Sequence, residues 1–416
     1  MNRLTLELAL RYVLGRKRSM SMSLLGITFG IAFFVVTQAQ TSGFEVFFIR
    51  TILGTNGAIR VSDKFQDMDG TVRTIDKEGK LLFTFKSREG SRYIEGTDSP
   101  NHLRRAISGF DGILGISEIL EGNAILDSGT RSYTISYNGI RLKDHVSVSD
   151  IESQIVSGDL STFNADQMSV LVGSRVAERL MIESGDRVTL KGGTGNLKLR
   201  VAGIFETGVS QIDKNRIYIH LDKAKEFSGR RFSGSFFQIG MLNPDRAEEV
   251  AAQMQLTLGH RVVSWQEREK VWLDVFKALR ISSAITVSSI LLLSGLGIFN
   301  VFAIMVIEKT RDIAILRSMG FSSLDASFVF LWQGVIVLII GIFSGSVLGA
   351  LATYTISSIP LRIRGIFSTD SFVVNWDYYH YIWAILIAGV FVLIASWIPA
   401  RRAGGIEPAK IIRETM

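Results

Sequence analysis

Four long stretches of this 416-residue chain contain no Asp, Glu, Lys or Arg, and they constrain its fold more than any other feature. Each is about 20 residues or longer, which at roughly 1.5 Å per residue lets a helix cross a hydrocarbon layer of about 30 Å. Core helices of soluble proteins rarely run so far without charge. The sequence therefore predicts four transmembrane helices, in residues 19–44, 281–307, 326–360 and 381–400.

The first uncharged stretch resembles a secretory signal peptide in one respect, because Arg16, Lys17 and Arg18 precede it. It is longer than a typical signal-peptide core, and no small-residue cleavage pattern closes it. We interpret it as a retained membrane anchor.

Basic residues gather beside the membrane ends on one side of the predicted topology. They precede the first span, separate the second from the third, and follow the fourth, whereas the loop between spans 3 and 4 carries Arg362 and Arg364. Because Lys and Arg accumulate in cytoplasmic loops, that side is predicted to be the cytoplasm. The net charge of +7 then follows largely from topology and requires no nucleic-acid partner. The basic residues on this side are Arg11, Arg16, Lys17, Arg18, Lys309, Arg311, Arg317, Arg401, Arg402, Lys410 and Arg413.

The expected fold is a membrane protein with four transmembrane helices plus a large α+β domain inserted between helices 1 and 2. The expected segments are an interfacial helix (1–18), transmembrane helix 1 (19–43), the exported domain with stalk helices (44–280), transmembrane helix 2 (281–307), a cytoplasmic helix (308–325), transmembrane helix 3 (326–356), an exported loop (357–380), transmembrane helix 4 (381–400) and a cytoplasmic tail (401–416).

The exported region has mixed charge, turn residues and short alternating apolar runs, the pattern of strands with interleaved helices. Asn243 followed by Pro244 is typical of a helix start. The chain has no cysteine, so this domain must form its core without disulfides. We expect an α+β domain of one or two lobes, with a helix at 174–182 and strands at 81–85, 133–137, 187–190, 197–201 and 216–220.

No pattern in the chain indicates catalysis. The glycine-rich KGGTGN at 191–196 lacks the order of a phosphate-binding loop and is better interpreted as a hairpin turn. The histidines are scattered without metal-ligand spacing, and no serine lies in a nucleophile-elbow motif. We therefore expect no enzyme, no metal and no cofactor in this chain, and we assign any ATP hydrolysis to another polypeptide.

Two amphipathic stretches join the exported domain to the membrane. Residues 265–280 place Trp265 and Trp272 at helical spacing and reach span 2 without Pro or Gly, which predicts one continuous stalk. A second stalk follows span 1, with Gly43 as a candidate hinge. The alternative is that both helices simply dock on the exported core.

Spans 1 and 3 contain glycines at four-residue intervals, the spacing that lets helix backbones approach closely in lipid. The sequence leaves open whether they contact this chain's own helices or another subunit. These glycines are Gly26, Gly30, Gly341, Gly345 and Gly349.

Five aromatic residues of spans 1 and 2 are candidates for the lining of an apolar cavity that holds acyl chains. Packed or lipid-facing aromatics are an equally good interpretation. The five are Phe29, Phe33, Phe34, Phe299 and Phe302.

The segment EKTRDIAILRSMG at 308–320 lies between two apolar spans. Each of its charges would cost roughly 3 kcal/mol at bilayer depth, so the segment must leave the membrane. Thr310 is a candidate cap and Gly320 a candidate terminator of a short helix. Its apolar residues are predicted to cluster on one side, which suits docking to a cytoplasmic partner. They are Ile313, Ile315, Leu316 and Met319.

Here the sequence resembles a known family. IMVIEKTRDIAILRSMG at 304–320, PARRAGGIEPAKIIRE at 399–414 and VLVGSRVAERLMIESGDRVTL in the exported domain closely resemble type VII ABC transporter permeases, the family of MacB and FtsX. The resemblance implies that the charged segment is a coupling helix that contacts an ATPase. Mapped onto this chain, the contacting residues are Glu308, Lys309, Arg311, Asp312, Ile313, Leu316, Arg317 and Gly320.

The resemblance also implies partners and a mechanism. Family members are dimers of permeases, identical or different, with a cytoplasmic ABC ATPase dimer that binds ATP and Mg²⁺. ATP-driven closure moves the exported domain through the stalks, which is called mechanotransmission. MacB carries a fused N-terminal ATPase, whereas this chain starts almost at the interfacial helix, which favours members with a separate ATPase.

Within the family, ILGTNGAIRVS at 52–62 and the SWQER stalk are most similar to the lipoprotein-releasing permeases of the LolC/LolE type. That similarity implies an inner-membrane protein whose periplasmic domain helps to extract lipoprotein or lipid cargo and hand it to a periplasmic carrier or adaptor. The alternatives are a tripartite efflux or glycolipid export permease, and an FtsX-like mechanotransmitter that controls a cell-wall hydrolase.

Overall fold

The computed structural model describes residues 2–15, 17–66, 70–75, 81–87, 92–94, 96–97, 100–193, 195–229, 234–359, 363–364, 368–369 and 372–405. Arg16, Arg362, Lys410 and Arg413, which entered the predicted topology, lie outside these ranges. The chain divides into two compact units. The membrane unit comprises Met1–Phe47, Asp274–Leu361 and Asp370–Met416, and the exported unit comprises Phe48–Leu273 and Arg362–Thr369.

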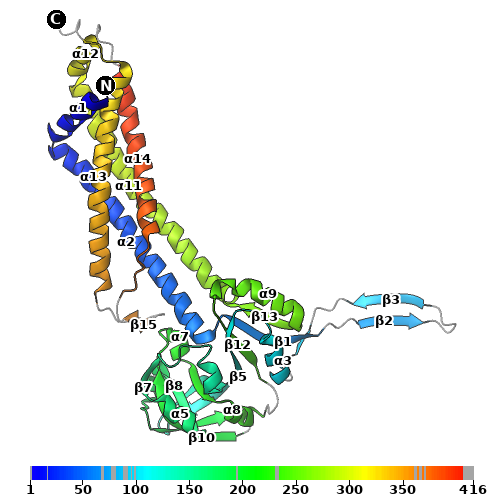
Figure 1. The fold of residues 1–416 in the computed structure, drawn as a ribbon. Coiled ribbons are helices and arrows are strands. Elements are labelled where there is room, and N and C mark those ends of the chain that lie inside the picture. The colour runs from blue at the N-terminus through cyan, green and yellow to red at the C-terminus, as the bar shows by residue number, and fades with distance from the viewer. Residues whose placement is uncertain are drawn as a thin grey trace. The chain divides into compact units, whose positions relative to one another are not determined.

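The membrane unit is a helical bundle, and the prediction of four transmembrane helices is confirmed. Its long helices pack around a core that includes Ile31, Phe302 and Phe330, and α1 packs against α13 (Figure 1). The helices are α1 (Asn2–Gly15), α2 (Lys17–Asn56), α11 (Lys270–Glu308), α12 (Thr310–Ser318), α13 (Ser323–Ser357) and α14 (Tyr378–Gly404).

Two of these helices, α2 and α11, continue past the apolar spans, but α11 starts later than predicted for the 265–280 stalk. The predicted continuity of this stalk with span 2 is confirmed from Lys270 onward, because α11 runs from Lys270 to Glu308, but its first residues form a separate short helix, α10 (Trp265–Arg268), with Glu269 as its C-cap. A local hydrogen bond explains why α10 starts at Trp265. The Ser264 side chain accepts a hydrogen bond from the Glu267 amide at 3.2 Å and caps α10.

Gly43 is not a hinge in this structure. It lies inside α2, which is helical from Lys17 to Asn56. A Cβ at this position would lie only 2.7 Å from the Cα of Val374, so the glycine admits a close backbone contact. Its function here is packing, which a sequence pattern alone does not distinguish from flexibility.

The exported unit contains an α+β domain built on one large sheet, as predicted. In hydrogen-bonding order its path is β13-β1-β12-β5-β6-β11-β8-β10-β7, with β4 on β1 and with β9 on both β10 and β5. The strands are β1 (Ile59–Gln66), β4 (Arg92–Ile94), β5 (Ile113–Asp127), β6 (Ser132–Ile140), β7 (Ile155–Gly158), β8 (Ser169–Gly173), β9 (Arg187–Gly192), β10 (Gly195–Phe205), β11 (Arg216–His220), β12 (Phe236–Met241) and β13 (His260–Ser264). Two separate pairs are β2 (Gly70–Ile75) with β3 (Leu81–Ser87) and β14 (Ile363–Arg364) with β15 (Ser368–Thr369).

Part of this sheet closes into a ring. The strands β5, β6, β11, β8, β10 and β9 pair in that order, and β9 pairs back to β5. Fully buried residues such as Leu190, Ile217 and Ile135 belong to one core cluster formed by these strands. Closure satisfies the backbone groups that an open edge would leave unpaired.

The remaining helices of this unit cover the sheet, and two local predictions are confirmed. The Asn243 side chain accepts a hydrogen bond from the Asp245 amide at the start of η1 (Pro244–Arg246). Within the KGGTGN segment, Gly192 and Lys191 of β9 pair antiparallel with Gly195 and Asn196 of β10, as expected for a hairpin, and Thr194 lies outside the described residues. The other helices are α3 (Pro100–Ile107), α4 (Leu142–His145), α5 (Leu160–Ala165), α6 (Ser174–Leu180), α7 (Ser210–Asp213), α8 (Leu221–Ser228) and α9 (Ala247–Leu258).

Candidate functional site

The charged segment between spans 2 and 3 forms α12, a short helix with a defined end on each side. Gly320 follows it with φ +103°, a conformation that favours glycine. Ser322 and Asp325 then form a capping box that starts α13. The predicted Thr310 cap is wrong, because its hydroxyl donates back to the Val306 carbonyl at 2.9 Å and Lys309 occupies the cap position.

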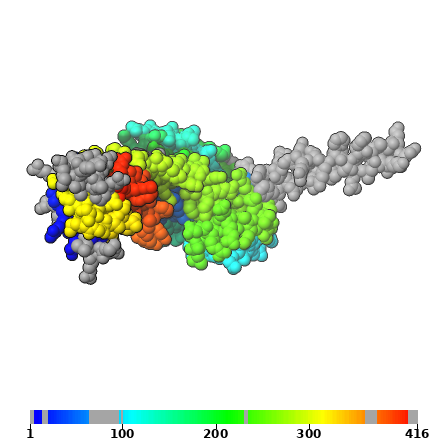
Figure 2. Space-filling model, turned by 90° about the horizontal axis from the view of Figure 1, so that it is seen from above, coloured from blue at the N-terminus to red at the C-terminus, as the bar shows by residue number. Residues whose placement is uncertain are grey.

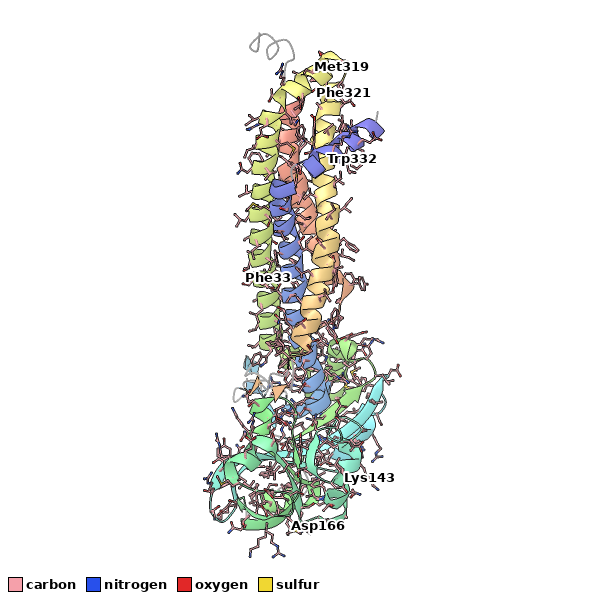
Figure 3. The ribbon with its side chains drawn as sticks, turned by 90° about the vertical axis from the view of Figure 1, so that its left-hand side faces the viewer. Phe33, Lys143, Asp166, Met319, Phe321 and Trp332 are labelled. Carbon is pink, nitrogen blue, oxygen red and sulfur yellow. The ribbon has the colours of Figure 1, made fainter. Side chains whose placement is uncertain are left out.

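The apolar residues of α12 do not share one face. Ile313 is 4% exposed and belongs to the bundle core, whereas Ile315 is 45% and Met319 76% exposed. Met319 and Phe321 lie at the end of the bundle (Figure 3). Viewed from above, onto that end of the bundle, the surface of this region (yellow) lies next to the end of α14 (red) (Figure 2). The helix thus presents Ile315 and Met319 outward while Ile313 fixes it to its own bundle.

The charged residues of the 308–320 segment differ in their surroundings. Arg311 is exposed. Lys309 forms an ion pair with Asp312 at 2.7 Å and lies 5.4 Å from the Tyr12 ring. Arg317 turns inward, where its Nη1 donates to the Gly404 carbonyl at 3.2 Å. Of the remaining predicted contact residues, Glu308 and Gly320 are exposed and Leu316 is half-buried.

Residues outside the charged segment hold it in place, and sequence reasoning missed them. Ser323 donates a hydrogen bond to the same Gly404 carbonyl that Arg317 contacts. A Cβ at Gly404 would lie 2.6 Å from the Ser323 carbonyl oxygen, so the end of α14 fits tightly against the start of α13. The S-x-x-D spacing of Ser322 and Asp325 was a readable signal for that start. No pattern in the sequence indicated that Tyr12 and Gly404 contact this segment.

The spaced glycines contact helices of this same chain. A Cβ at Gly345 would lie 2.8 Å from Ile31 Cβ, and one at Gly349 would lie 3.2 Å from the Cα of Ala32, so α13 meets α2 along this row. Gly341 meets Ile27 of α2 in the same way. The other side of α2 meets α11, where a Cβ at Gly26 would lie 3.0 Å from Ser294 Oγ and one at Gly30 would collide with Leu291.

The five candidate cavity aromatics do not come together. Phe34 and Phe302 are buried in the bundle core, and Phe299 packs against it. Phe29 is 59% and Phe33 48% exposed, and Phe33 lies midway along α2 (Figure 3). Helix periodicity places residues 29 and 33 on a different side of α2 from residue 34, and an acyl-chain cavity at these residues stays a prediction.

A buried histidine lies in the exported unit. His145 is fully buried, its Nδ1 is 3.3 Å from Ser117 Oγ, and its ring centroid is 5.3 Å from that of Tyr218. Burial, reinforced by the positive charge of Arg216, lowers the pKa of His145 to about 3. The ring is therefore neutral wherever the domain is folded near neutral pH.

We expect acid to destabilise the exported unit through His145. Below pH 6.5 the unfolded chain binds a proton at this position and the folded chain does not, so the free energy of unfolding falls as the pH drops toward about 3. The slope is at most about 1.4 kcal/mol per pH unit. Thermal unfolding of the full chain in detergent between neutral pH and pH 4.5 measures it. His145→Gln should flatten this dependence, whereas the exposed control His102→Gln should not; equal slopes in both variants would contradict the assignment.

The fold and the site define a multi-pass membrane protein with a large domain between its first two spans and a charged helix exposed between spans 2 and 3. The family model described as FtsX-like permease C-terminal matches residues 284–408, and that described as MacB-like periplasmic core domain matches residues 20–256. The second match covers more than half of the chain. The protein belongs to the MacB/FtsX family of ABC transporter permeases.

Several known proteins are similar to this chain. The lipoprotein-releasing system transmembrane protein LolC of Xylella fastidiosa (strain Temecula1) is 24% identical, with 99% of each chain covered. LolC of Neisseria meningitidis is 21% identical, with 98% of each covered. The macrolide export ATP-binding/permease protein MacB of Pasteurella multocida is 26% identical over 51% of this chain and 33% of its own. The periplasmic region of MacB from Actinobacillus actinomycetemcomitans, a solved structure, is 14% identical with a TM-score of 0.36, covering 54% of this chain and 94% of its own.

These matches settle the class and the location of the protein. It is an ABC transporter permease of the LolC/MacB type, located in the inner membrane with a periplasmic domain between its first and second spans. As a permease of this class it works with an ATPase. The predicted family, fold class and location are thus confirmed.

Proposed function

We propose that this permease couples ATP hydrolysis by a separate cytoplasmic ATPase dimer to motion of its periplasmic domain, and thereby extracts lipoproteins from the inner membrane for transfer to a periplasmic carrier. One observation carries the choice of cargo. The LolC relatives correspond to this chain over 98–99% of both lengths, whereas the MacB relative from Pasteurella multocida is matched over 33% of its own. A second permease subunit, identical or different, completes the proposed complex.

The surface of α12 supports the proposed contact with the ATPase. Ile315 and Met319 offer exposed apolar area, and Arg311 adds an exposed charge beside them. An apolar patch with a charged border suits a protein partner. ATP and Mg²⁺ would be bound by that partner, and Glu308, Lys309, Asp312 and Gly320 remain part of the proposed contact.

The long helices support the proposed transmission of motion. Both α2 (Lys17–Asn56) and α11 (Lys270–Glu308) are continuous helices that extend beyond their membrane spans. A continuous helix transmits displacement, whereas a flexible linker absorbs it.

Release of lipoprotein from vesicles tests the proposal. The permease is purified in mild detergent together with its ATPase and any second permease, and reconstituted with an acylated lipoprotein. We expect ATP-dependent transfer of the lipoprotein to a soluble periplasmic carrier, measured as lipoprotein in the supernatant after the vesicles are pelleted. In this assay Arg105→Glu serves as the control for charge reversal on α12. It replaces an exposed arginine far along the sequence from α12, and the complex that carries it should transfer lipoprotein at the normal rate.

Absence of any ATP-dependent transfer from active complex would refute lipoprotein release. The same vesicles then distinguish the alternatives, because a MacB-like efflux permease should instead bind a periplasmic adaptor and export a small amphiphile. An FtsX-like mechanotransmitter should move no cargo and should activate a cell-wall hydrolase.

A further inference from the structure

A polar cavity of about 760 Å³ opens in the exported unit and has no part in the proposed coupling. It lies beside β1, β5, β13 and α10. Its charged lining contains equal numbers of guanidinium and carboxylate groups, which are Arg60, Arg261, Arg268, Asp63, Glu121 and Glu267. A cavity of mixed charge on this scale is larger than a single ion requires.

Arg60 is held in a fixed position with most of its donors unused. Its guanidinium carbon lies 3.6 Å from the centroid of the Phe236 ring, which fixes the plane of the group. Among the residues that the structure describes, its one hydrogen bond goes from Nη2 to Glu121 Oε2 at 3.5 Å. A guanidinium has five N–H donors in a fork that matches carboxylate and phosphate oxygens.

The guanidinium of Arg268 also lines this cavity, and two hydrogen bonds hold it in place. Arg268 donates from Nε to Glu269 at 3.1 Å and from Nη2 to the Gly57 carbonyl at 3.2 Å. Burial lowers the pKa of both Arg60 and Arg268, and the positive charge of Arg216 lowers both further. Like charges held together in a partly desolvated site are stabilised by an anion between them.

The carboxylates of the cavity indicate that a plain anion is not the best ligand. Glu121 is 40% exposed and accepts a hydrogen bond from Ser136 at 3.4 Å. Asp63 accepts one from the Gly96 amide at 3.0 Å. These groups would repel a ligand that is anionic throughout, whereas they would attract an ammonium placed a few bonds from the anionic group.

A smaller groove of about 290 Å³ shares the lining residue Glu121 with this cavity. Its lining includes Phe48 and Trp272, whose rings are 5.6 Å apart, together with Ile52 and Val209. The groove also contains polar groups such as Arg216 and Glu269, so only its Phe48–Trp272 side offers an apolar surface to a ligand with a charged head and an apolar body.

We propose that this cavity binds a zwitterionic phosphate-ester head group. The phosphate contacts Arg60 and Arg268, and the ammonium contacts Glu121. An attached apolar chain extends toward Phe48 and Trp272. The ligand is a membrane lipid or a soluble phosphodiester with the same head group. This inference goes beyond the proposed function and is independent of it, because binding is measured on the permease without its ATPase.

Binding to the full chain in dodecyl maltoside, a detergent with neither phosphate nor ammonium, tests the site. Titration calorimetry compares glycerophosphoethanolamine with glycerophosphoglycerol, which lacks the ammonium, and with dihexanoyl phosphatidylethanolamine. We expect saturable binding of both ethanolamine compounds. Tighter binding of the short-chain lipid identifies a membrane lipid as the ligand, and equal binding identifies a soluble phosphodiester; either result supports the head-group site.

Three variants locate the ligand. Arg60→Gln should weaken glycerophosphoethanolamine binding about tenfold or more, and Arg60→Lys, which keeps the charge but loses the fork, should weaken it as well. Glu121→Gln should weaken the ethanolamine probe but not glycerophosphoglycerol. The exposed-arginine control Arg105→Gln should bind normally. No saturable binding of any probe, unchanged binding in both Arg60 variants, or equal loss of both probes in Glu121→Gln would overturn the proposal.

Discussion

Gly345→Leu is expected to destabilise the membrane unit strongly and to lower its unfolding temperature. A Cβ at this position would lie 2.8 Å from Ile31 Cβ and 3.0 Å from the Thr28 carbonyl oxygen, so the conflict is partly with backbone and no rotamer relieves it. Overpacking a well-packed core typically costs about 1–3 kcal/mol, and the need to separate two helices places this variant at about 3 kcal/mol or above. Gly345→Ala should show a smaller loss of the same sign.

Size-exclusion chromatography and thermal unfolding in detergent measure the effect. Gly297→Leu is the matched control, because the same residue is introduced on α11 at an exposed glycine where a Cβ would meet nothing within 4 Å. A Gly345→Leu protein that elutes and unfolds like the control would show that α13 and α2 do not meet as described.

Arg311→Glu is expected to uncouple the permease from its ATPase while leaving it folded. Arg311 is exposed, so we expect reversal of its charge to disturb no contact with the part of the chain that the structure describes. On a docking surface the reversal places a like or unpaired charge against the partner, which typically costs enough to reduce affinity about tenfold or more. Co-purification of the ATPase and stimulated ATP hydrolysis in the reconstituted complex measure the loss.

Arg317→Glu is the informative comparison, because it should fail for a different reason. Arg317 donates to the Gly404 carbonyl, and a carboxylate there would face an oxygen. Loss of a hydrogen bond to a charged group costs about 1.5–3 kcal/mol, so this variant should lower the unfolding temperature, whereas Arg311→Glu should not. Normal ATPase binding by Arg311→Glu, or a lowered unfolding temperature in that variant, would remove α12 as the proposed contact surface.

The parts of this fold that depend on local pattern were predictable. Four uncharged stretches indicated the spans, and alternation located β6, β9, β10 and β11. The Asn243 cap and the 191–196 hairpin followed from residue types that favour one backbone conformation. Each of these signals lies within a few residues of the structure that it predicts.

The parts that depend on distant neighbours were not predictable. The spacing of Gly345 predicted a close helix contact but not its partner, whereas Gly43 had no such spacing, and only its neighbour Val374 shows that it admits a close contact. Closure of the ring depends on the pairing of β9 with β5, whose residues are far apart in sequence. On α12, periodicity grouped Ile313 with Ile315 and Met319, but it did not show which of them faces the bundle.

The two rows of glycine contacts on α2 limit how the membrane unit can deform. Gly26 and Gly30 bring one face of α2 against α11, and Ile31 and Ala32 on the opposite face fit the glycines of α13. Rotation of α2 about its own axis would open one contact row and drive bulky side chains into the other. Axial rotation of α2 is therefore a stiff coordinate, and a displacement of α2 that keeps both contact rows must carry α11 and α13 with it.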